Sequence, residues 1–318
     1  MATPHGGRAG FAGATDHSVE TVFLVNPASD SGATGRRWPE LVRRASAAGL
    51  RGDTLLSERP GHLTDLARQA ASGGAKLFVA VGGDGTVNEV VNGLAEIEGA
   101  ELAVVHRGTG GDFVRTFQIP HRLEDALDVA ARGATREIDL GRATLKTWAG
   151  REGTIWFANL ASAGMSGAVA KRVNETDNVL GGKLSYAWAT VAVFARWRNA
   201  HVEVSVDGET REGAMHDVMV ANGRYVGGGM KICPDAEPDD GLFDVLLIGD
   251  VTKRDLVTTL PKIYRGTHLP HPKAELLRGR EVTIASPEPL PVELDGEQPG
   301  TTPARFEVVP RALRVRVP

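Results

Sequence analysis

An aspartate inside a glycine-rich turn is the group in this sequence best placed to do chemistry. Asp84 lies in the segment GGDGT (residues 82–86), between an apolar run at 77–81 and a helical pattern of apolar residues ending at Leu94. Glycines let the main chain approach a phosphate closely, and a helix start offers free N–H groups and a favourable dipole. A carboxylate is repelled by phosphate unless it orients a metal ion, a water or an attacking hydroxyl. The turn therefore indicates phosphate chemistry, with Asp84 as a plain helix cap as the simpler alternative.

The elements around this turn indicate a sheet that would hold it at one edge. Strands are expected at residues 21–25, 53–56, 77–81 and 102–105, and helices at 38–48, 62–71, 87–94 and 123–132. Alternating strands and helices are typical of a parallel sheet covered by helices. Ligands bind such sheets beyond the carboxyl ends of the strands, where the polar loops at 26–32, 82–88 and 108–112 would meet.

The pattern changes near residue 136, after which strands are many and helices few. Strands are expected at 142–148, 154–160, 201–206, 217–221, 242–248, 281–285 and 291–294, and helices at 183–198 and 253–265. This spacing is typical of an antiparallel sandwich. We expect a disordered tail (1–18), an α/β nucleotide-binding domain (19–140) and a β-rich domain (141–311), with the active site in the cleft between the two domains. A last strand at 312–318 is a candidate to return to the first domain.

Composition narrows the class of protein. The 318 residues are 42% hydrophobic and carry 36 basic and 40 acidic side chains, so the net charge of −4 gives no reason to expect a nucleic-acid partner. One cysteine, Cys233, excludes an internal disulfide framework and fits a reducing cytoplasm. No signal peptide or transmembrane segment is visible. We expect a cytoplasmic protein that meets a membrane only peripherally; whether it forms a homodimer is left open.

Residues 79–94 (VAVGGDGTVNEVVNGL) resemble the signature of the diacylglycerol kinase catalytic domain family, which includes bacterial lipid kinases and sphingosine and ceramide kinases. Other segments resemble that family's motifs in the same order: Asn26-Pro27, RGTGGDF (107–113), ANGRYVGGGM (221–230), PDAEPDDGL (234–242) and ELDGE (293–297). The resemblance covers nearly the whole chain from residue 21. The segment GGDG alone also occurs in NAD kinases and phosphofructokinases. Only the whole set of motifs, in this order, is therefore specific for the family.

The resemblance implies a nucleotide site for ATP, with Mg²⁺ offsetting the phosphate charge. The implied nucleotide-binding residues are Asn26, Pro27, Ser57, Gly82, Gly83, Asp84, Gly85, Thr86, Asn88, Gly108, Thr109 and Asp112. It also implies that Glu297 is the general base for the acceptor hydroxyl, with Asp295 in support and Asp84 acting through metal or water. Without the resemblance, residues 295 and 296 favour an ordinary Asp-Gly hairpin turn.

A second, structural Mg²⁺ site is implied at the turn 238–241. Its ligands would be the Asp240 carboxylate and the main-chain carbonyls of Glu237 and Leu242, although a plain turn explains the same residues. The sequence departs from the family pattern at Gly111, where Asn is usual, and at Arg107, where a proline or small residue is common. The missing amide puts nucleotide preference in doubt. Arg107 either contacts a phosphate or points into solvent, and both interpretations stay open.

The implied reaction is transfer of the γ-phosphate of ATP to a lipid hydroxyl, with diacylglycerol, giving phosphatidate, as the first choice. Ceramide, sphingoid bases, monoacylglycerol and polyprenol-type alcohols stay open as acceptors. Two alternatives are a soluble-metabolite kinase such as an NAD kinase, and a non-catalytic nucleotide- or lipid-binding protein. The helices expected at 183–198 and 253–265 combine apolar stripes with basic residues, so either could meet a membrane, although packing on a core is the simpler explanation.

Overall fold

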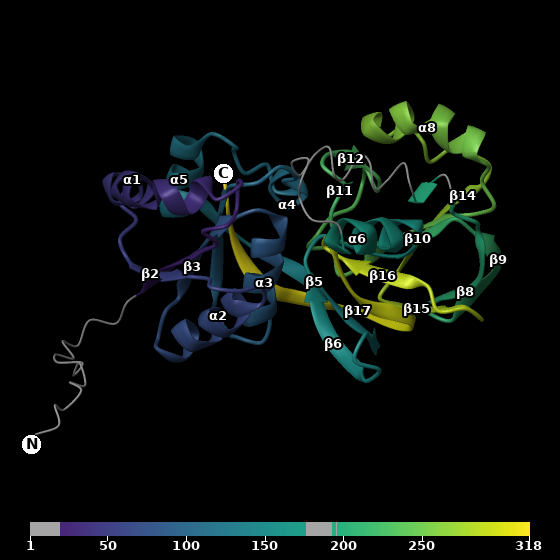
Figure 1. Cartoon of the computed structure of the whole chain (residues 1–318), viewed down its shortest axis with the longest axis horizontal. Coiled ribbons are helices and arrows are strands. Elements are labelled where there is room, and N and C mark those ends of the chain that lie inside the picture. Colours follow the sequence, from purple (N-terminus) through teal and green to yellow (C-terminus); the bar gives the residue numbers. More distant parts are fainter. Residues whose placement is uncertain (1–19, 176–192, 195) are drawn as a thin grey trace, which may run out of the picture.

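The computed structural model describes residues 20–175, 193–194 and 196–318. The tail expected at 1–18 and most of the helix expected at 183–198 lie outside this part of the chain. A parallel α/β half and a β-rich half lie next to each other along the long axis of the molecule (Figure 1). The expected fold class is confirmed by this arrangement. None of the helices in the described residues is long and apolar enough to cross a bilayer.

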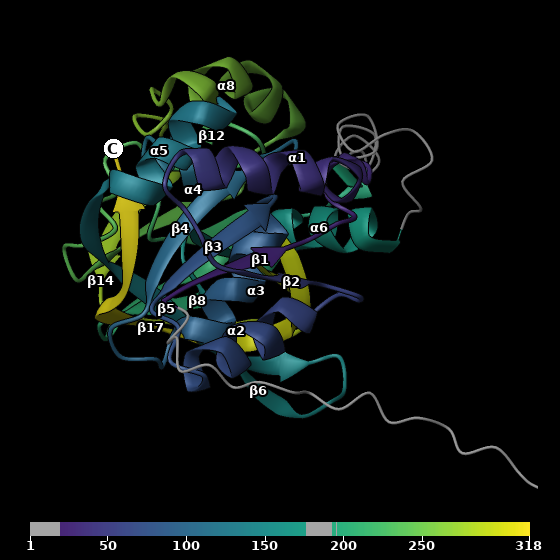
Figure 2. The same ribbon diagram turned by 90° about the vertical axis from the view of Figure 1, so that its left-hand side faces the viewer.

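The first half is a parallel sheet with helices on both faces. Its strands are β1 (Thr21–Val25), β2 (Asp53–Leu56), β3 (Leu77–Gly82) and β4 (Glu101–His106), in the spatial order β4-β3-β1-β2. Helices α1 (Ala33–Ala47) and α5 (Leu123–Arg132) pack on one face, and α2 (His62–Ser72) and α3 (Asp84–Leu94) pack on the other (Figure 2). A short helix, α4 (Asp112–Thr116), follows β4. All these helices except α4 were expected.

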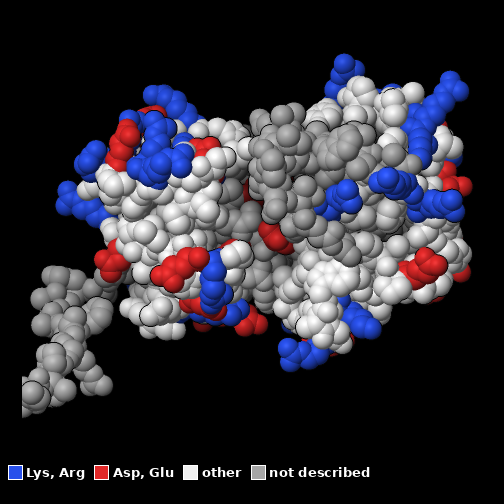
Figure 3. All heavy atoms as spheres, viewed as in Figure 1, with Lys and Arg blue, Asp and Glu red and all other residues white. Residues whose placement is uncertain are grey.

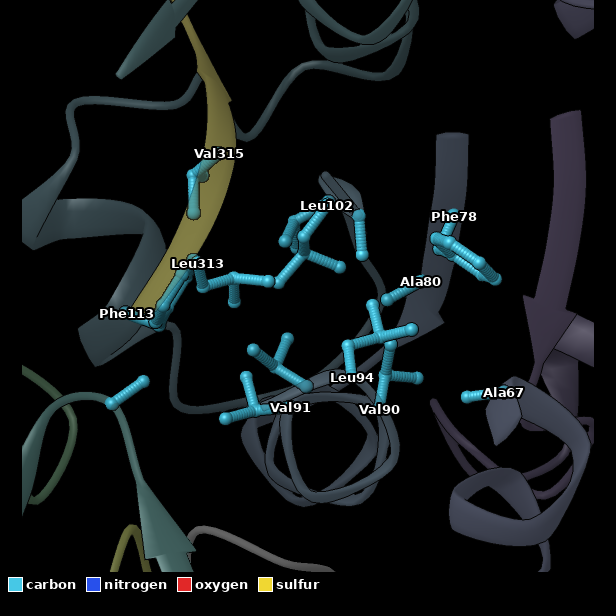
Figure 4. Close-up of a cluster of buried hydrophobic side chains, with 14 of the residues drawn as sticks. Ala67, Phe78, Ala80, Val90, Val91, Leu94, Leu102, Phe113, Leu313 and Val315 are labelled. Atoms are coloured by element: carbon cyan, nitrogen blue, oxygen red, sulfur yellow. The ribbon is translucent and has the colours of Figure 1, made fainter. Parts of the chain in front are cut away.

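The apolar pattern of α3 explains why it packs where it does. Val90, Val91 and Leu94 recur at helical spacing, are fully buried, and face Phe78 and Ala80 of β3 (Figure 4). Because successive strand residues point to opposite faces, Val79 and Val81 instead join the core under α1 and α5. Burial of several such side chains, each contributing about 1.5–3 kcal/mol, holds α3 against the sheet.

The second half is a curved antiparallel layer around its own core. Its strands are β5 (Ala134–Thr147), β6 (Glu152–Phe157), β7 (Leu160–Gly164), β8 (Ala200–Val206), β9 (Glu209–Met215), β10 (Asp217–Ala221), β13 (Phe243–Ile248), β14 (Ala274–Gly279), β15 (Glu281–Ala285), β16 (Pro291–Leu294) and β17 (Glu297–Val317). A small hairpin, β11 (Tyr225–Val226) and β12 (Met230–Lys231), and the helices α6 (Met165–Glu175) and α8 (Lys253–Arg265) lie on this layer. Its core centres on Phe157, Phe243 and Phe306, apart from the core of the first half.

One long strand joins the two halves. Strand β17 pairs with β16 near its start and along most of its length with β5, and then runs parallel to β4 at Arg314 and Val315. Among the described residues the hydrogen-bonded ladder is therefore continuous from one half to the other. Residues 312–318 were a candidate to return to the first half, and β17 does pair with β4 there. The sequence did not indicate that these residues end a strand beginning at Glu297, nor that β5 runs across residue 140. The division into domains at that residue stays a prediction.

Candidate active site

The polar loops of the parallel half meet at one sheet edge because the strand ends are in register. Val25 lies opposite both Leu56 and Val81, and Gly82 lies opposite His106. Main-chain hydrogen bonds extend the ladder one step: Ser57 N donates to Val25 O (2.9 Å), Asn26 N to Val81 O (3.0 Å) and Arg107 N to Gly82 O (2.6 Å). The expected nucleotide-binding positions Ser57, Asn26 and Gly82 therefore form one row.

Asn26 and Thr86 fasten the first two loops together. The Asn26 side-chain amide donates to Thr86 Oγ1 (3.2 Å), and its oxygen accepts from Ala28 N (3.0 Å). Thr86 is only 4% exposed, and a Cβ on Gly82 would lie 2.2 Å from its hydroxyl oxygen. Both residues were expected to bind nucleotide; in this arrangement the Thr86 hydroxyl shapes the loop from inside. Pro27 packs against Gly35 at the start of α1.

Asp84 stands where the two glycine loops approach each other. Its Oδ2 accepts from Gly111 N (2.6 Å), whereas its Oδ1 is buried and has no hydrogen-bond partner in the described part of the chain. The loops touch through main chain, since a Cβ on Gly108 would lie 2.8 Å from Gly83 Cα. The N-cap of α3 is Gly83, and the hydrogen bond of Asp84 reaches the neighbouring loop. The simpler interpretation of Asp84 as a cap of its own helix is not supported.

The departures at positions 111 and 107 both have structural explanations. Gly111 has a φ of 89°, and a Cβ there would lie 2.8 Å from His121 Cε1 and 3.2 Å from His106 Nε2. The imidazoles of His106 and His121 therefore fill the space that an Asn side chain would need. His106 is buried, and burial lowers its pKa. Arg107 neither points freely into solvent nor stands unpaired, because it forms an ion pair with Asp30 of the first loop (2.6 Å).

The turn after β16 carries the second group of expected catalytic residues. Asp295 and Gly296 have φ values of 50° and 93°, as a tight hairpin turn requires. The Asp295 carboxylate accepts from the main-chain N–H groups of residues 158, 159 and 160 (2.8–3.0 Å) and from the Asn88 side chain (3.3 Å). Burial raises the pKa of Asp295, although these donors oppose the shift. Asn88, which was expected to bind the nucleotide, is buried and donates a hydrogen bond to this carboxylate.

Glu297 lies beside the glycine-rich turn, although it belongs to the other half of the molecule. An ideal Cβ on Gly85 would be 3.2 Å from Glu297 Oε1, and the Glu297 side chain is exposed. The two expected catalytic carboxylates, Asp84 and Glu297, therefore flank the first turn of α3. Each is presented by a rigid element: a helix start in one case, and a hairpin turn held by several N–H donors in the other.

Glu293 belongs to the motif at 293–297, but sequence reasoning gave it no role; in the structure it supports this turn. It is 4% exposed, accepts from Ser162 Oγ (2.9 Å) and from Gly296 N, and burial raises its pKa to about 8. It lies between Val292 and Leu294 in β16, so strand alternation alone would put it on the solvent face. Helix α6 packs on that face and buries it. The local sequence carries no signal for this burial.

The third polar loop connects to the β11–β12 hairpin. Asp112 accepts from Gly228 N (2.8 Å) and pairs with Arg115 (3.2 Å), and burial raises its pKa. Thr109 is exposed at the tip of this loop, next to Gly108. Asn159, a further residue that sequence reasoning missed, donates from its side chain to Tyr225 O (2.7 Å). Asp112 therefore ties its loop to the β-rich half.

The turn expected to hold a structural Mg²⁺ is fixed by protein contacts. Asp240 accepts from Leu242 N (3.0 Å) and forms an ion pair with Arg278, while Asp239 pairs with Arg136 (2.7 Å). Gly241 N donates to the buried Asp139 (2.7 Å). Glu237 lies in the same turn, but the described residues contain no group of three or more His, Cys, Asp or Glu side chains placed to hold a metal. Because each Asp240 oxygen already has a protein partner, a Mg²⁺ bound here would compete with Arg278 for this carboxylate, and the metal site stays a prediction.

Comparisons with known proteins agree with this geometry. Residues 20–143 match the diacylglycerol kinase catalytic domain, and residues 159–317 match the YegS C-terminal NAD kinase beta sandwich-like domain. The chain is 27% identical over 297 residues to the diacylglycerol kinase of Staphylococcus carnosus (strain TM300), covering 93% of this chain and 94% of that protein. It is 28% identical over 298 residues to that of Bacillus subtilis (strain 168), covering 93% and 95%.

Solved structures show the same fold. A chain from Bacillus anthracis str. Sterne superposes with a TM-score of 0.77 at 24% identity, covering 97% of this chain and 98% of that one. A yeast NADH kinase complexed with NADH reaches a TM-score of 0.51 at 11% identity, over 92% and 79%.

The fold and the family matches place the chain in the class of kinases with the architecture that NAD kinases and diacylglycerol kinases share. Within that class, the chain belongs to the diacylglycerol kinase catalytic domain family. The relatives support a lipid kinase in general terms.

Proposed function

We propose that this protein transfers the γ-phosphate of ATP to a lipid hydroxyl, with diacylglycerol as the first candidate acceptor and phosphatidate as the product. The observation that carries the proposal is the meeting of Asp84 and Glu297 from opposite halves at the first turn of α3. The names of the relatives from Staphylococcus carnosus and Bacillus subtilis support diacylglycerol.

The glycine loops suit a polyphosphate. Gly83 and Gly108 bring main chain close together, and the α3 N-terminus lacks a side-chain cap, so its N–H groups are open to an anion. Arg107 stands at the same edge, held by Asp30. In a kinase without a P-loop, such N–H groups and a nearby guanidinium position the phosphates, and positioning with electrostatic stabilisation accounts for most of catalysis.

Asp84 fits a role at Mg²⁺. Its Oδ1 is a buried carboxylate oxygen without a partner in the described residues, which is the hard oxygen donor that Mg²⁺ prefers. Bound there with ATP, the ion would offset the negative charge of the phosphates. The hydrogen bond from Gly111 N holds the other oxygen and so sets the orientation of the carboxylate.

Glu297 takes the proton from the acceptor hydroxyl in this proposal. Asp295, which accepts four hydrogen bonds, and Glu293, which accepts from Gly296 N, hold the turn that presents Glu297. A general base works only within hydrogen-bond reach of its proton, so a rigid turn is part of its function. Asn88 links this turn to α3 and therefore to Asp84.

A labelled-ATP assay over a panel of lipid micelles and NAD tests the proposal. Glu297→Gln should lower kcat on the preferred lipid by at least about 10²-fold, since general bases contribute about 10²–10⁴-fold. Glu288→Gln, on an exposed carboxylate in the loop before β16, is the matched control and should leave kcat unchanged. Equal labelling by Glu297→Gln would remove Glu297 from the mechanism.

The same assay separates a second candidate. The fold similarity to a yeast NADH kinase, with a TM-score of 0.51, favours a nucleotide acceptor such as NAD as the alternative. Labelling of NAD alone, with no lipid labelled, would replace the lipid proposal with this one.

A further inference from the structure

Helix α8 presents two different faces to its surroundings. Its inner face carries Leu256, Thr259 and Ile263, which line a small cavity over β13 together with Leu246 and Ile248. Its outer face carries Val257, Leu260 and Tyr264, which are 62%, 46% and 52% exposed. These residues recur at helical spacing, so they form one apolar stripe. The described part of the chain exposes only three other large apolar side chains, and none of them is on a helix.

Basic residues flank the stripe. Lys253, Arg254, Lys262 and Arg265 are all exposed. The only acidic residue of α8, Asp255, is occupied: it accepts from Thr252 N (2.9 Å) and from Lys273 (3.0 Å), and these partners hold its pKa well below its usual range. Figure 3 shows Lys and Arg side chains gathered over the α8 end of the molecule. The outer face of α8 is therefore apolar along its centre and positively charged around it.

We propose that this outer face of α8 docks the protein on an anionic lipid bilayer. An amphipathic helix of this kind lies in the interface, with apolar side chains in the acyl boundary and basic ones among anionic headgroups. Each basic residue near such a surface adds to the electrostatic attraction, and the effect decays within a Debye length. A protein partner that bound only the apolar stripe would not require the basic residues beside it. The inference rests on the proposed function, because an enzyme that phosphorylates a bilayer lipid must meet the bilayer.

Packing connects this face to the candidate active site. The C-terminal end of α8 rests on β12, where a Cβ on Gly266 would lie 3.0 Å from the Lys231 side chain. The paired strand β11 contacts α4, and Gly228 N donates to Asp112 at the start of α4. In two views α8, β12 and α4 follow one another along the upper side of the molecule (Figures 1 and 2). A docked α8 would therefore bring the lipid surface next to the elements that carry the glycine loops.

Vesicle flotation tests the docking face directly. Wild-type protein should float with vesicles of equimolar phosphatidylglycerol and phosphatidylcholine, and less with phosphatidylcholine alone. Replacing Val257, Leu260 and Tyr264 together by Gln, which keeps helix propensity, should weaken binding at least about tenfold. Replacing Arg254, Lys262 and Arg265 by Gln should weaken binding to the anionic vesicles and remove most of its salt dependence. Circular dichroism melts would verify that these surface variants remain folded.

A matched control lies on the opposite side of the molecule. Trp148 and Arg151, in the β5–β6 turn, supply one exposed aromatic and one exposed basic residue far from α8 (Figure 1). The double variant Trp148→Ser, Arg151→Gln should float as the wild type does. If it loses binding as strongly as the α8 variants, or if the α8 variants float normally, the proposal is wrong. It is also wrong if the only effect of the α8 substitutions is to dissociate a dimer of this chain.

Activity on a dispersed substrate separates this inference from the proposed function. On a short-chain diacylglycerol below its micelle concentration, the α8 variants should keep wild-type turnover, because they do not touch the catalytic residues. On vesicles their turnover should fall in parallel with binding. Wild-type protein that floats but phosphorylates no lipid would refute the proposed function and leave the docking face intact. Full turnover of the variants on vesicles would refute the docking face alone.

Discussion

The carboxylates around the candidate site differ in how many hydrogen bonds they accept from the protein. Asp295 accepts four hydrogen bonds and Glu293 two, whereas Asp84 has one satisfied oxygen and one buried oxygen without a partner in the described residues. A buried and unpaired carboxylate oxygen is unfavourable unless something else binds it. The first two therefore support the architecture, and Asp84 is the group with capacity left for a ligand.

Two substitutions at Asp84 separate its role in catalysis from its role in the loop. Asp84→Asn can still accept from Gly111 N but loses the negative charge, so it should abolish phosphoryl transfer while the melting temperature stays near that of the wild type. Asp84→Ala should abolish transfer too, and also lower the free energy of unfolding by about 1 kcal/mol through the lost hydrogen bond. More than a few per cent of wild-type turnover in purified Asp84→Asn would contradict the assignment.

Glu293 should make stability depend on pH. Its pKa is about 8 in the folded protein, above its ordinary value, so the folded state holds a proton that the unfolded chain has lost. That stabilisation is fully present below about pH 4.3, the ordinary pKa of Glu, and is lost as the pH rises through about 8. Glu293→Gln, which mimics the protonated form, should therefore be more stable than wild type at pH 8–9 by on the order of 1–3 kcal/mol, and similar at pH 4. Denaturant unfolding across that range would measure the difference; equal curves for both proteins would show that Glu293 is ionised in the fold.

At the scale of elements, the site is formed by strand ends and turns, and neighbouring strands and helices hold these in position. The strand ends β1, β2, β3 and β4 align the first loops, and the β16–β17 turn brings Glu297 to α3. Motif residues predicted these loops and their meeting at a sheet edge, because glycine and Asp-Gly turns carry local signals. They could not predict the burial of Glu293 or the contacts of Asn159, since these depend on α6 and on the β11–β12 hairpin packing from elsewhere in the chain.

The turn at 238–241 offers a prediction at this scale. With its oxygens engaged by Arg278 and Leu242 N, Asp240 acts in an ion pair that is largely exposed, and such pairs contribute about 0–1 kcal/mol. Asp240→Ala should therefore lower the melting temperature slightly and leave any shift of that temperature by Mg²⁺ unchanged. Differential scanning calorimetry with and without Mg²⁺ measures both effects. Loss of a Mg²⁺-dependent shift in the variant alone would contradict this expectation and support the metal assignment of Glu237, Asp240 and Leu242.

At the scale of the whole molecule, two separate cores are linked by one ladder. The change in pattern near residue 136 predicted the two halves, because alternating elements and dense strands require different layers. The alternation at the last strand made it a candidate to return to the first half, but nothing indicated that this strand begins at Glu297 or that β5 also runs through both halves. The pairing of β17 with β4 joins residues more than two hundred positions apart, and no local pattern specifies such a contact.

That pairing can be tested by weakening the last strand. Val315 is fully buried in the core of the first half, opposite Leu102. Val315→Ala removes two methyl groups, so it should lower the free energy of unfolding by about 1–3 kcal/mol. Val317→Ala, one alternation further on and only half-buried, is the control and should cost less. Equal effects in denaturant unfolding would show that the end of β17 contributes little to the first core.

The position of β17 also bears on how the chain is made. A ribosome releases β1, β2, β3 and β4 early, at about 5–20 residues per second, yet the edge of β4 stays open until Arg314 and Val315 of β17 emerge. An open strand edge is a template for pairing with other chains. Until β17 has been made, the nascent first half is therefore exposed to misassembly, and a chain truncated before Arg314 would leave that edge uncovered. The sheet of the first half can therefore close only after the strands of the β-rich half have been made.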